Sequence, residues 1–170
     1  MPAPQRDDHS MTNSNAVRPP NRVRVVWAGD QRFDTGRPDG PAVRIDGRGA
    51  TGPSPVDSLL SALGACSGID AVEILAKRRT PVERLVVNVT GDRVPTTPRR
   101  LEHVLLEFVI EGAGIERVHA ERAVELSVTK YCSVRDSLAP DVEIEWTVVL
   151  NGEPGMLINR APAAGRATRG

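Results

Sequence analysis

The sequence predicts one α+β domain in which antiparallel sheet packs on two helices, and three observations support this. A long apolar segment over residues 55–79 has the spacing of a buried helix. Segments that alternate apolar and polar residues lie on both sides of it, which is typical of strands. In order, we expect three short strands, the long helix, two strands, a second helix and a last strand, and this order is typical of an α+β fold.

Three short strands are predicted before the long helix. The first is "RVRVVWA", in which Val23, Val25 and Trp27 alternate with arginine or valine. Weaker strand patterns follow over residues 32–35 and 42–46. These segments would form a small antiparallel sheet.

The long helix has clear signals at both ends. Ser54 can cap it, Pro55 suits its first position, and Asp57 falls where a carboxylate closes a capping box. The helix should end near Arg79, because Pro81 follows. Its first half is apolar nearly all round, so we predict a central helix that is covered on several sides.

Two strands, a second helix and a last strand complete the predicted fold. The segments "RLVVNVTGDRV" and "LEHVLLEFVIEG" alternate in the manner of strands, and the turn-rich "PTTPR" joins them. Helical spacing returns over residues 115–131, bends near "KYCSV" and gives way to a short helical turn. The last strand is "VEIEWTVVL", which places Trp146 on its apolar face.

The size of the chain fits one domain, which we assign to residues 22–153. Of its 170 residues 39% are hydrophobic, enough for a sizeable core. Residues 1–21 are rich in Pro, Asn, Asp, Ser and Arg, and residues 154–170 in Ala, Gly, Arg and Pro. Neither end has a sustained apolar period, so we predict that both are disordered.

Charge and hydropathy exclude several classes of partner. Lys and Arg together number 22, as do Asp and Glu, which gives no electrostatic reason to expect nucleic acid or an anionic membrane. The first residues lack the apolar core of a secretory signal, and no run approaches the ~18 apolar residues of a membrane span. We therefore expect a cytoplasmic protein with a small neutral or apolar partner.

The sequence predicts no metal and no nucleotide site. His9, His103 and His119 are scattered, and none stands at metal-ligand spacing from a cysteine. The glycine-rich "DGRGATGPSP" precedes a helix but lacks the Lys-Ser/Thr ending of a phosphate-binding loop.

The chain has two cysteines, Cys66 in "LLSALGACSGIDAV" and Cys132 in "KYCSV". Each could be a core residue, because free cysteine is among the most buried residue types. A reducing cytosol favours free thiols or a reversible redox pair over a permanent disulfide. The residues alone leave open whether the two sulfurs are inert or reactive.

If Cys66 is reactive, it needs activation from outside its own helix. A thiol reduces peroxide only as the thiolate, which a nearby cation or a helix N-terminus stabilises. Cys66 lies about three turns from the helix start, and the helix-dipole effect fades within the first turn. We therefore expect an arginine from the N-terminal strands, oriented by a carboxylate. If Cys132 reaches Cys66, a sulfenic acid on one sulfur would condense with the other thiol to a disulfide.

The two cysteine segments resemble those of a known family. "SPVDSLLSALGACSGIDAVEILAKRR", followed about sixty residues later by "AVELSVTKYCSV", is similar to the OsmC/Ohr family of thiol-dependent hydroperoxide reductases, and the resemblance covers roughly residues 22–152. It implies an OsmC-like fold, with antiparallel sheets wrapped around two central helices in an intertwined homodimer and two active sites at the subunit interface.

The resemblance also implies an activity. Cys66 would be the peroxidatic thiol and Cys132 the resolving thiol, in the reduction of organic hydroperoxides to alcohols as a defence against oxidative stress. Family members are recycled by an external dithiol, notably a lipoyl group, and need no metal or flavin.

The charged residues of the family site correspond less closely. Arg32 is the best match to the family arginine, with Arg37 second. The family glutamate stands where this chain has Val56, and Asp57 follows it, as either a site carboxylate or only the capping-box residue. Ser133 replaces a proline, so the chain resembles a divergent OsmC-like subgroup.

Two other functions therefore stay open. The chain could be a non-catalytic dimer that responds to redox state or binds a small ligand, or both cysteines could be inert core residues.

Overall fold

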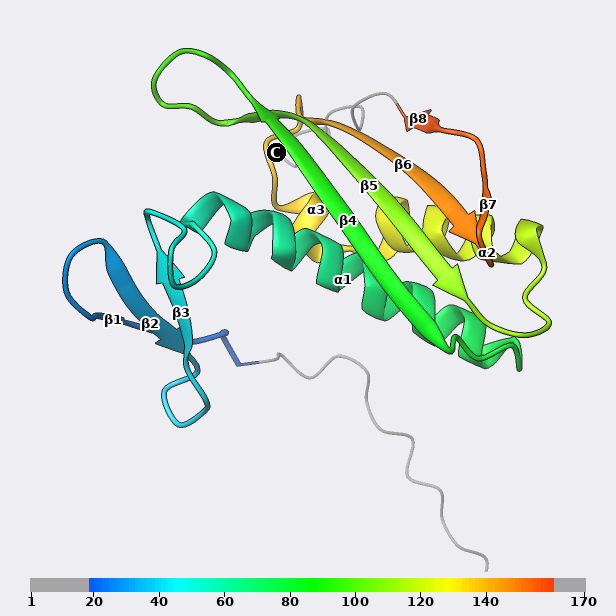
Figure 1. Ribbon diagram of the computed structural model, residues 1–170, viewed down its shortest axis with the longest axis horizontal. Coiled ribbons are helices and arrows are strands. Elements are labelled where there is room, and N and C mark those ends of the chain that lie inside the picture. The colour runs from blue at the N-terminus through cyan, green and yellow to red at the C-terminus, as the bar shows by residue number, and fades with distance from the viewer. Residues whose placement is uncertain (1–18, 161–170) are drawn as a thin grey trace, which may run out of the picture.

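The computed structural model describes residues 19–160, and it has two separate sheets (Figure 1). The first comprises β1 (Arg24–Trp27), β2 (Arg32–Gly36) and β3 (Val43–Asp46), paired antiparallel in that order. We call these three strands the N-terminal sheet. They confirm the three short strands predicted from the sequence. The predicted disorder of the first residues falls mostly on residues 1–18, which lie outside the described residues.

Helix α1 (Pro55–Lys77) is the long central helix. Both hydrogen bonds of the predicted capping box form, between Ser54 and Asp57. The helix ends two residues before the predicted Arg79, which itself has a positive φ of 64°. By length and composition α1 is also the one described helix apolar enough to cross a bilayer, although here it packs against a sheet and a second helix.

The second sheet is built on three long strands, β4 (Arg84–Arg93), β5 (Leu101–Glu111) and β6 (Glu143–Leu150). β4 and β5 form the expected antiparallel hairpin, but β5 and β6 are parallel. The expectation of purely antiparallel sheets is therefore wrong at this pair. Parallel neighbours need a crossover connection, and the second helical region between β5 and β6 provides it.

The second sheet continues past the predicted end of the domain at residue 153. Strands β7 (Glu153–Pro154) and β8 (Ile158–Arg160) both pair antiparallel with β6. Ile158 lies opposite Trp146 in this register. The predicted boundary at residue 154 therefore lies too early in the sequence, because the residues that follow it pair with β6. Residues 161–170 lie outside the described residues.

The second helical region has three parts. Helix α2 (Arg117–Leu126) continues without interruption into a wider π-helical turn, η1 (Ser127–Tyr131). The chain then becomes extended at Cys132 and enters the short helix α3 (Ser133–Asp136). The bend predicted near "KYCSV" is confirmed.

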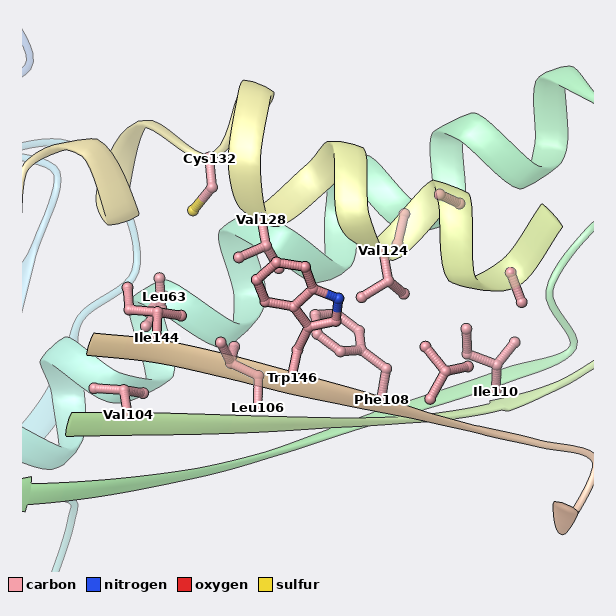
Figure 2. Close-up of a cluster of buried hydrophobic side chains, with 14 of the residues drawn as sticks. Leu63, Val104, Leu106, Phe108, Ile110, Val124, Val128, Cys132, Ile144 and Trp146 are labelled. Atoms are coloured by element: carbon pink, nitrogen blue, oxygen red, sulfur yellow. The ribbon is translucent and has the colours of Figure 1, made fainter. Parts of the chain in front are cut away.

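The core lies between the second sheet and the helices, which cover one face of that sheet (Figures 1 and 2). Alternate residues of β5 and β6 point into it, as the strand patterns predicted. The largest side chains that are almost fully buried there are Trp146, Phe108, Leu63, Leu75, Leu106 and Ile110.

A glycine allows α1 to approach β4 closely. A Cβ atom at Gly64 would lie 2.8 Å from Val89 Cγ2 and 3.6 Å from Val87 Cγ1. Any larger residue would push the helix away from the strand.

The N-terminal sheet lies to one side of this body, near the start of α1 (Figure 1). Its apolar side chains are largely exposed, including Val25, Val26, Trp27 and Val43. The second sheet with its helices, residues 55–160, is called the body below.

Candidate active site: the paired cysteines

Cys66 lies three turns into α1 and is half-buried. Leu63 and Ser67 beside it are fully buried, so this part of the helix faces the interior. Cys66 packs against the core without being enclosed by it. The sulfur is thus placed by a rigid helix and keeps access to solvent.

Cys132 lies where the η1 turn gives way to α3 (Figure 2). Its amide donates to the Ser127 carbonyl at 2.9 Å, and its Sγ accepts from the Arg135 amide at 3.3 Å. The side chain is only 4% exposed. Cys132 therefore caps the short helix while its sulfur remains inside the protein.

The structure brings the two thiols together, although 66 positions separate them in the sequence. Helix α3 packs on α1. Each thiol is a hydrogen-bonding neighbour that changes the pKa of the other, and both cysteines are free. The two thiols are therefore neighbours, which the condensation of a sulfenic acid with a second thiol requires.

The surroundings of Cys66 favour its thiolate. Burial alone raises the pKa of the Cys66 thiol, but hydrogen bonding outweighs this effect and lowers the pKa below its usual value. The donors are first the Val134 amide, then the Cys132 thiol, and then the hydroxyl and amide of Ser133. A sulfur with several donors is better stabilised as an anion than as a thiol.

The surroundings of Cys132 have the opposite effect. Burial is the main cause that raises the pKa of the Cys132 thiol, and the neighbouring Cys66 adds to the increase. The Ser67 hydroxyl and the Arg135 amide lower the pKa but do not offset the burial. Cys66 is therefore the more acidic and the less deeply buried of the two cysteines.

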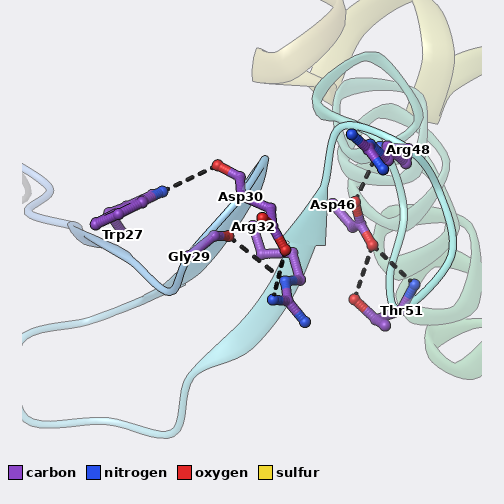
Figure 3. A network of polar contacts seen from close by, with 7 residues as sticks. All are labelled: Trp27, Gly29, Asp30, Arg32, Asp46, Arg48 and Thr51. Carbon is purple, nitrogen blue, oxygen red and sulfur yellow. Dashed lines mark hydrogen bonds and ion pairs between the residues drawn. The ribbon is translucent and has the colours of Figure 1, made fainter.

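Arg32 belongs to β2 and Arg37 to the loop that follows it, so both lie outside the body that contains Cys66. Arg32 Nη2 forms an ion pair with Asp30 Oδ2 at 2.9 Å, within the turn between β1 and β2 (Figure 3). Arg37 lies beyond β2 on an exposed loop. Neither is among the groups that shift the pKa of Cys66. Within one chain, Arg32 therefore belongs to the N-terminal sheet, whereas Cys66 belongs to the body.

Asp57 is occupied by the capping box. Its Oδ2 accepts from the Ser54 amide at 2.9 Å, and hydrogen bonds from Ser54 lower the pKa of its carboxyl group. Nine residues separate Asp57 from Cys66, which is roughly 13 Å along a helix. Val56, at the position of the family glutamate, packs against the core. Neither residue orients a guanidinium near the sulfur in this chain.

Sequence reasoning missed the donors that do reach Cys66. It considered only the distant start of α1 and therefore required a cation. The structure instead places neutral donors from Ser133 and Val134 beside the sulfur. The predicted helical turn after "KYCSV" could have indicated them, because the first amides of any helix lack partners within it.

An apolar groove of about 540 Å³ lies between α1 and β4, and Ala65, the residue before Cys66, is part of its lining. Its lining includes Gly64, Ala65, Ile69 and Val87. Ile69 is 60% exposed, whereas Leu63 is buried in the core. Ile69 on the groove is therefore available to a ligand or a second protein, whereas Leu63 is not. Among the described residues no group of three or more His, Cys, Asp or Glu side chains could hold a metal ion.

Comparison with known proteins places these features in a family context. A family model described as OsmC-like protein matches residues 47–147. Protein YhfA of Escherichia coli K12 is 37% identical over 124 residues, which is 72% of this chain and 92% of YhfA. Both cysteines fall within the residues that the family model matches.

Solved structures share the fold. A hypothetical protein from Aquifex aeolicus VF5 has a TM-score of 0.68 at 27% identity, covering 79% of this chain and 99% of that chain. A Legionella pneumophila protein described as an organic hydroperoxide resistance protein, OsmC, has a TM-score of 0.56 at 15% identity, covering 75% and 94% of the two chains. At this low identity the second likeness concerns the fold alone.

Proposed function

The chain belongs to the OsmC-like protein family, and on that premise we propose that it reduces organic hydroperoxides to alcohols with its two thiols. The observation that carries the proposal is the adjacent cysteine pair, with the pKa of Cys66 lowered and that of Cys132 raised. This asymmetry assigns attack to Cys66 and resolution to Cys132. A role in peroxide stress agrees with the family, and the cytoplasm is the proposed compartment.

The first step uses the Cys66 thiolate. Its sulfur attacks one peroxide oxygen, so an S–O bond forms while the O–O bond breaks. The peroxide is reduced by two electrons and leaves as an alkoxide, which takes up a proton to become the alcohol. Cys66 is oxidised to a sulfenic acid, which the hydrogen bonds from Ser133 and Val134 would hold in place.

The second step uses Cys132. As its thiol gives up a proton, the sulfur attacks the Cys66 sulfenic acid, an S–S bond forms and the S–O bond breaks. The departing hydroxide takes up that proton and leaves as water. An external dithiol, such as a lipoyl group, would then return two electrons and two protons and restore both thiols.

The apolar groove beside Cys66 supports an organic rather than an inorganic peroxide. An apolar substituent gains free energy when it leaves water, about 0.8 kcal/mol per buried CH₂ group. Hydrogen peroxide has no such substituent. We therefore expect bulky organic hydroperoxides to react faster than hydrogen peroxide.

We propose that the working protein is a homodimer. Val25 and Trp27 of the N-terminal sheet are 61% and 67% exposed, and Ile69 on α1 is 60% exposed. A small sheet needs a packed hydrophobic face or a helix against it for independent stability. A second copy is the proposed cover, because each copy offers both an apolar sheet and an apolar helix face.

A dimer would also give Arg32 a role. The N-terminal sheet lies to one side of its own body (Figure 1), so the sheet of the partner could reach Cys66. Arg32 is the proposed activating arginine in that arrangement and Asp57 the proposed carboxylate. Replacing Arg32 with Ala should then slow Cys66 oxidation without lowering the stability of the body.

Intact mass spectrometry with cumene hydroperoxide tests the proposed function. The parent should lose two hydrogen atoms as a disulfide forms, and the Cys132→Ser variant should gain one oxygen atom on Cys66. Cys66→Ser, the matched control, should leave Cys132 reduced. If the parent thiols survive excess peroxide, the proposal is wrong.

A second function is favoured by one observation, the absence of Arg32 from the Cys66 surroundings in a single chain. The protein would then be a redox-responsive dimer that forms the disulfide once and turns over slowly. Repeated cycles with dihydrolipoamide separate the two functions. Sustained peroxide consumption supports the enzyme, whereas a single stoichiometric oxidation supports the sensor.

A further inference from the structure

We propose that the chain's two Cys-Ser dipeptides, Cys66-Ser67 and Cys132-Ser133, form a crossed pair in which each serine serves the sulfur of the other dipeptide. Ser133 would be a positioning residue for the Cys66 thiolate, and Ser67 a positioning residue for Cys132 when it attacks the sulfenic acid. The inference rests on the proposed function and adds two residues to its mechanism.

Ser133 is placed by the fold next to Cys66. It is the first residue of α3, which packs on α1. Both its hydroxyl and its amide act on the Cys66 sulfur, and both favour the anion. A proline, which the family resemblance places at this position, has neither group. Ser133 therefore supplies two donors that a proline would remove.

Ser67 has the reciprocal position. Its side chain is fully buried, and its Oγ has no hydrogen-bond partner among the described residues. The hydroxyl nevertheless lies close enough to Cys132 to lower the pKa of that thiol. A buried hydroxyl without a partner is destabilising. A sulfur that becomes an anion during the second step would give this hydroxyl the acceptor that it lacks.

Neutral groups have the largest effects on the pKa of Cys66. Burial raises the pKa, and the Val134 amide, the Cys132 thiol and the Ser133 hydroxyl and amide lower it. Uncharged donors, chiefly from residues 133 and 134, therefore favour the Cys66 thiolate.

The role of Ser133 is tested by titrating the Cys66 thiol without any peroxide. All variants carry Cys132→Ala, so that one thiol remains, and the rate of alkylation by iodoacetamide is followed against pH. Adding Ser133→Ala should raise the pKa of Cys66 by about one pH unit, because a hydrogen bond to a charged group is stronger than one between neutral groups.

Further variants test whether the two donors of Ser133 are what lowers the pKa of Cys66. Ser133→Thr keeps both donors and should restore the parent profile. Ser133→Pro removes both donors at a first helical position that tolerates proline, and should raise the pKa most. Ser61→Ala is the matched control, because the Ser61 hydroxyl bonds the Asp57 carbonyl on the same helix, and it should change nothing. An unaltered pKa in both Ser133→Ala and Ser133→Pro would overturn the role of Ser133.

The role of Ser67 is tested by the rate of disulfide formation. Ser67→Ala should slow the second step about tenfold relative to the first, while the melting temperature stays the same or rises, because a costly buried hydroxyl is gone. Oxidation with diamide, which also requires Cys132 to attack a modified Cys66, gives the same comparison without peroxide. An unchanged second step with both oxidants would overturn the role of Ser67.

These experiments test the crossed pair separately from the proposed function. The thiol titration and the diamide reaction do not depend on peroxide chemistry. If they give the expected shifts but cumene hydroperoxide leaves Cys66 reduced, the crossed pair stands and the proposed function is wrong. If peroxide oxidises Cys66 at the parent rate in the Ser133 variants and the disulfide forms at the parent rate in the Ser67 variant, the crossed pair is wrong and the proposed function stands.

Discussion

The body and the N-terminal sheet differ in how far their apolar residues are buried. The chain has two tryptophans, and they mark the difference: Trp146 in the body is 1% exposed, and Trp27 in the N-terminal sheet is 67% exposed. Both lie in strands with a similar alternating pattern. One strand faces helices of its own chain, while the other faces solvent.

The body is complete within a single chain, whereas the N-terminal sheet is not. The body contains a closed core and both cysteines, so the thiol pair is assembled without help. The N-terminal sheet contains Arg32 but has little of its own chain to pack against. The proposed reaction therefore combines a finished thiol pair with an arginine that only a second copy can deliver.

The largest expected effect is on the stability of the body. Trp146→Ala removes a fully buried side chain and should cost about 3–5 kcal/mol of unfolding free energy. Trp27→Ala, the matched variant, should change body unfolding by much less. Urea unfolding followed by circular dichroism at low protein concentration measures both. Equal losses would show that the two regions do not differ.

The next effect is on association. Trp27→Ala should weaken the proposed dimer about tenfold or more, because a buried aromatic side chain dominates interface energetics. Sedimentation velocity over a dilution series measures the dissociation constant. Val118→Ala, which truncates a comparably exposed residue on α2, should leave it unchanged. A parent that stays monomeric at high concentration would contradict the dimer.

How much the sequence predicted differs between the same two regions. The capping signals at Ser54 and Asp57 are local, and they located α1 correctly. The alternation in β5 and β6 correctly identified the faces that meet the helices. The OsmC-like fold expected from the cysteine segments is confirmed by the similar structures.

Non-local features were harder to predict. Alternation within a strand does not reveal its neighbour, so the parallel β5–β6 pair was missed. Nor could the sequence show that Ser133 and Val134 reach the sulfur of Cys66, which is far from them along the chain. Arg32 was chosen by resemblance, and its position in a separate sheet depends on tertiary structure.

A smaller effect concerns pH and the body. His103 bridges Asp92 and Glu145 across three strands, with both ring nitrogens 3.1 Å from a carboxylate oxygen. These two partners, Asp92 first, raise the pKa of His103 above its usual value. The bridge should stabilise the body fully below about pH 6.5, the unfolded value, and lose this contribution as the pH rises through the folded pKa.

Urea midpoints across that range measure the loss. The parent should lose less than about 1 kcal/mol, because the bridge is partly exposed. His103→Gln should abolish the dependence. A parent whose stability rises over the same pH range would contradict the assignment.

The smallest effect has the opposite sign and belongs to the N-terminal sheet. Arg44 Nη2 donates to Asp34 Oδ2 at 3.1 Å, and this partner lowers the pKa of the Asp34 carboxyl group. Its contribution is present above about pH 3.9 and is lost as the pH falls through the folded pKa. Asp34→Asn should therefore remove part of the acid sensitivity of Trp27 fluorescence and leave that of Trp146 unchanged.

The central claim is that Cys66 and Cys132 are a working pair, and thiol stoichiometry tests it most directly. Reduced protein is mixed with one equivalent of cumene hydroperoxide per chain, and free thiols are counted after denaturation. One equivalent of peroxide should consume both thiols and yield one equivalent of the alcohol. Two free thiols per chain, or loss of only one with no disulfide, would contradict it.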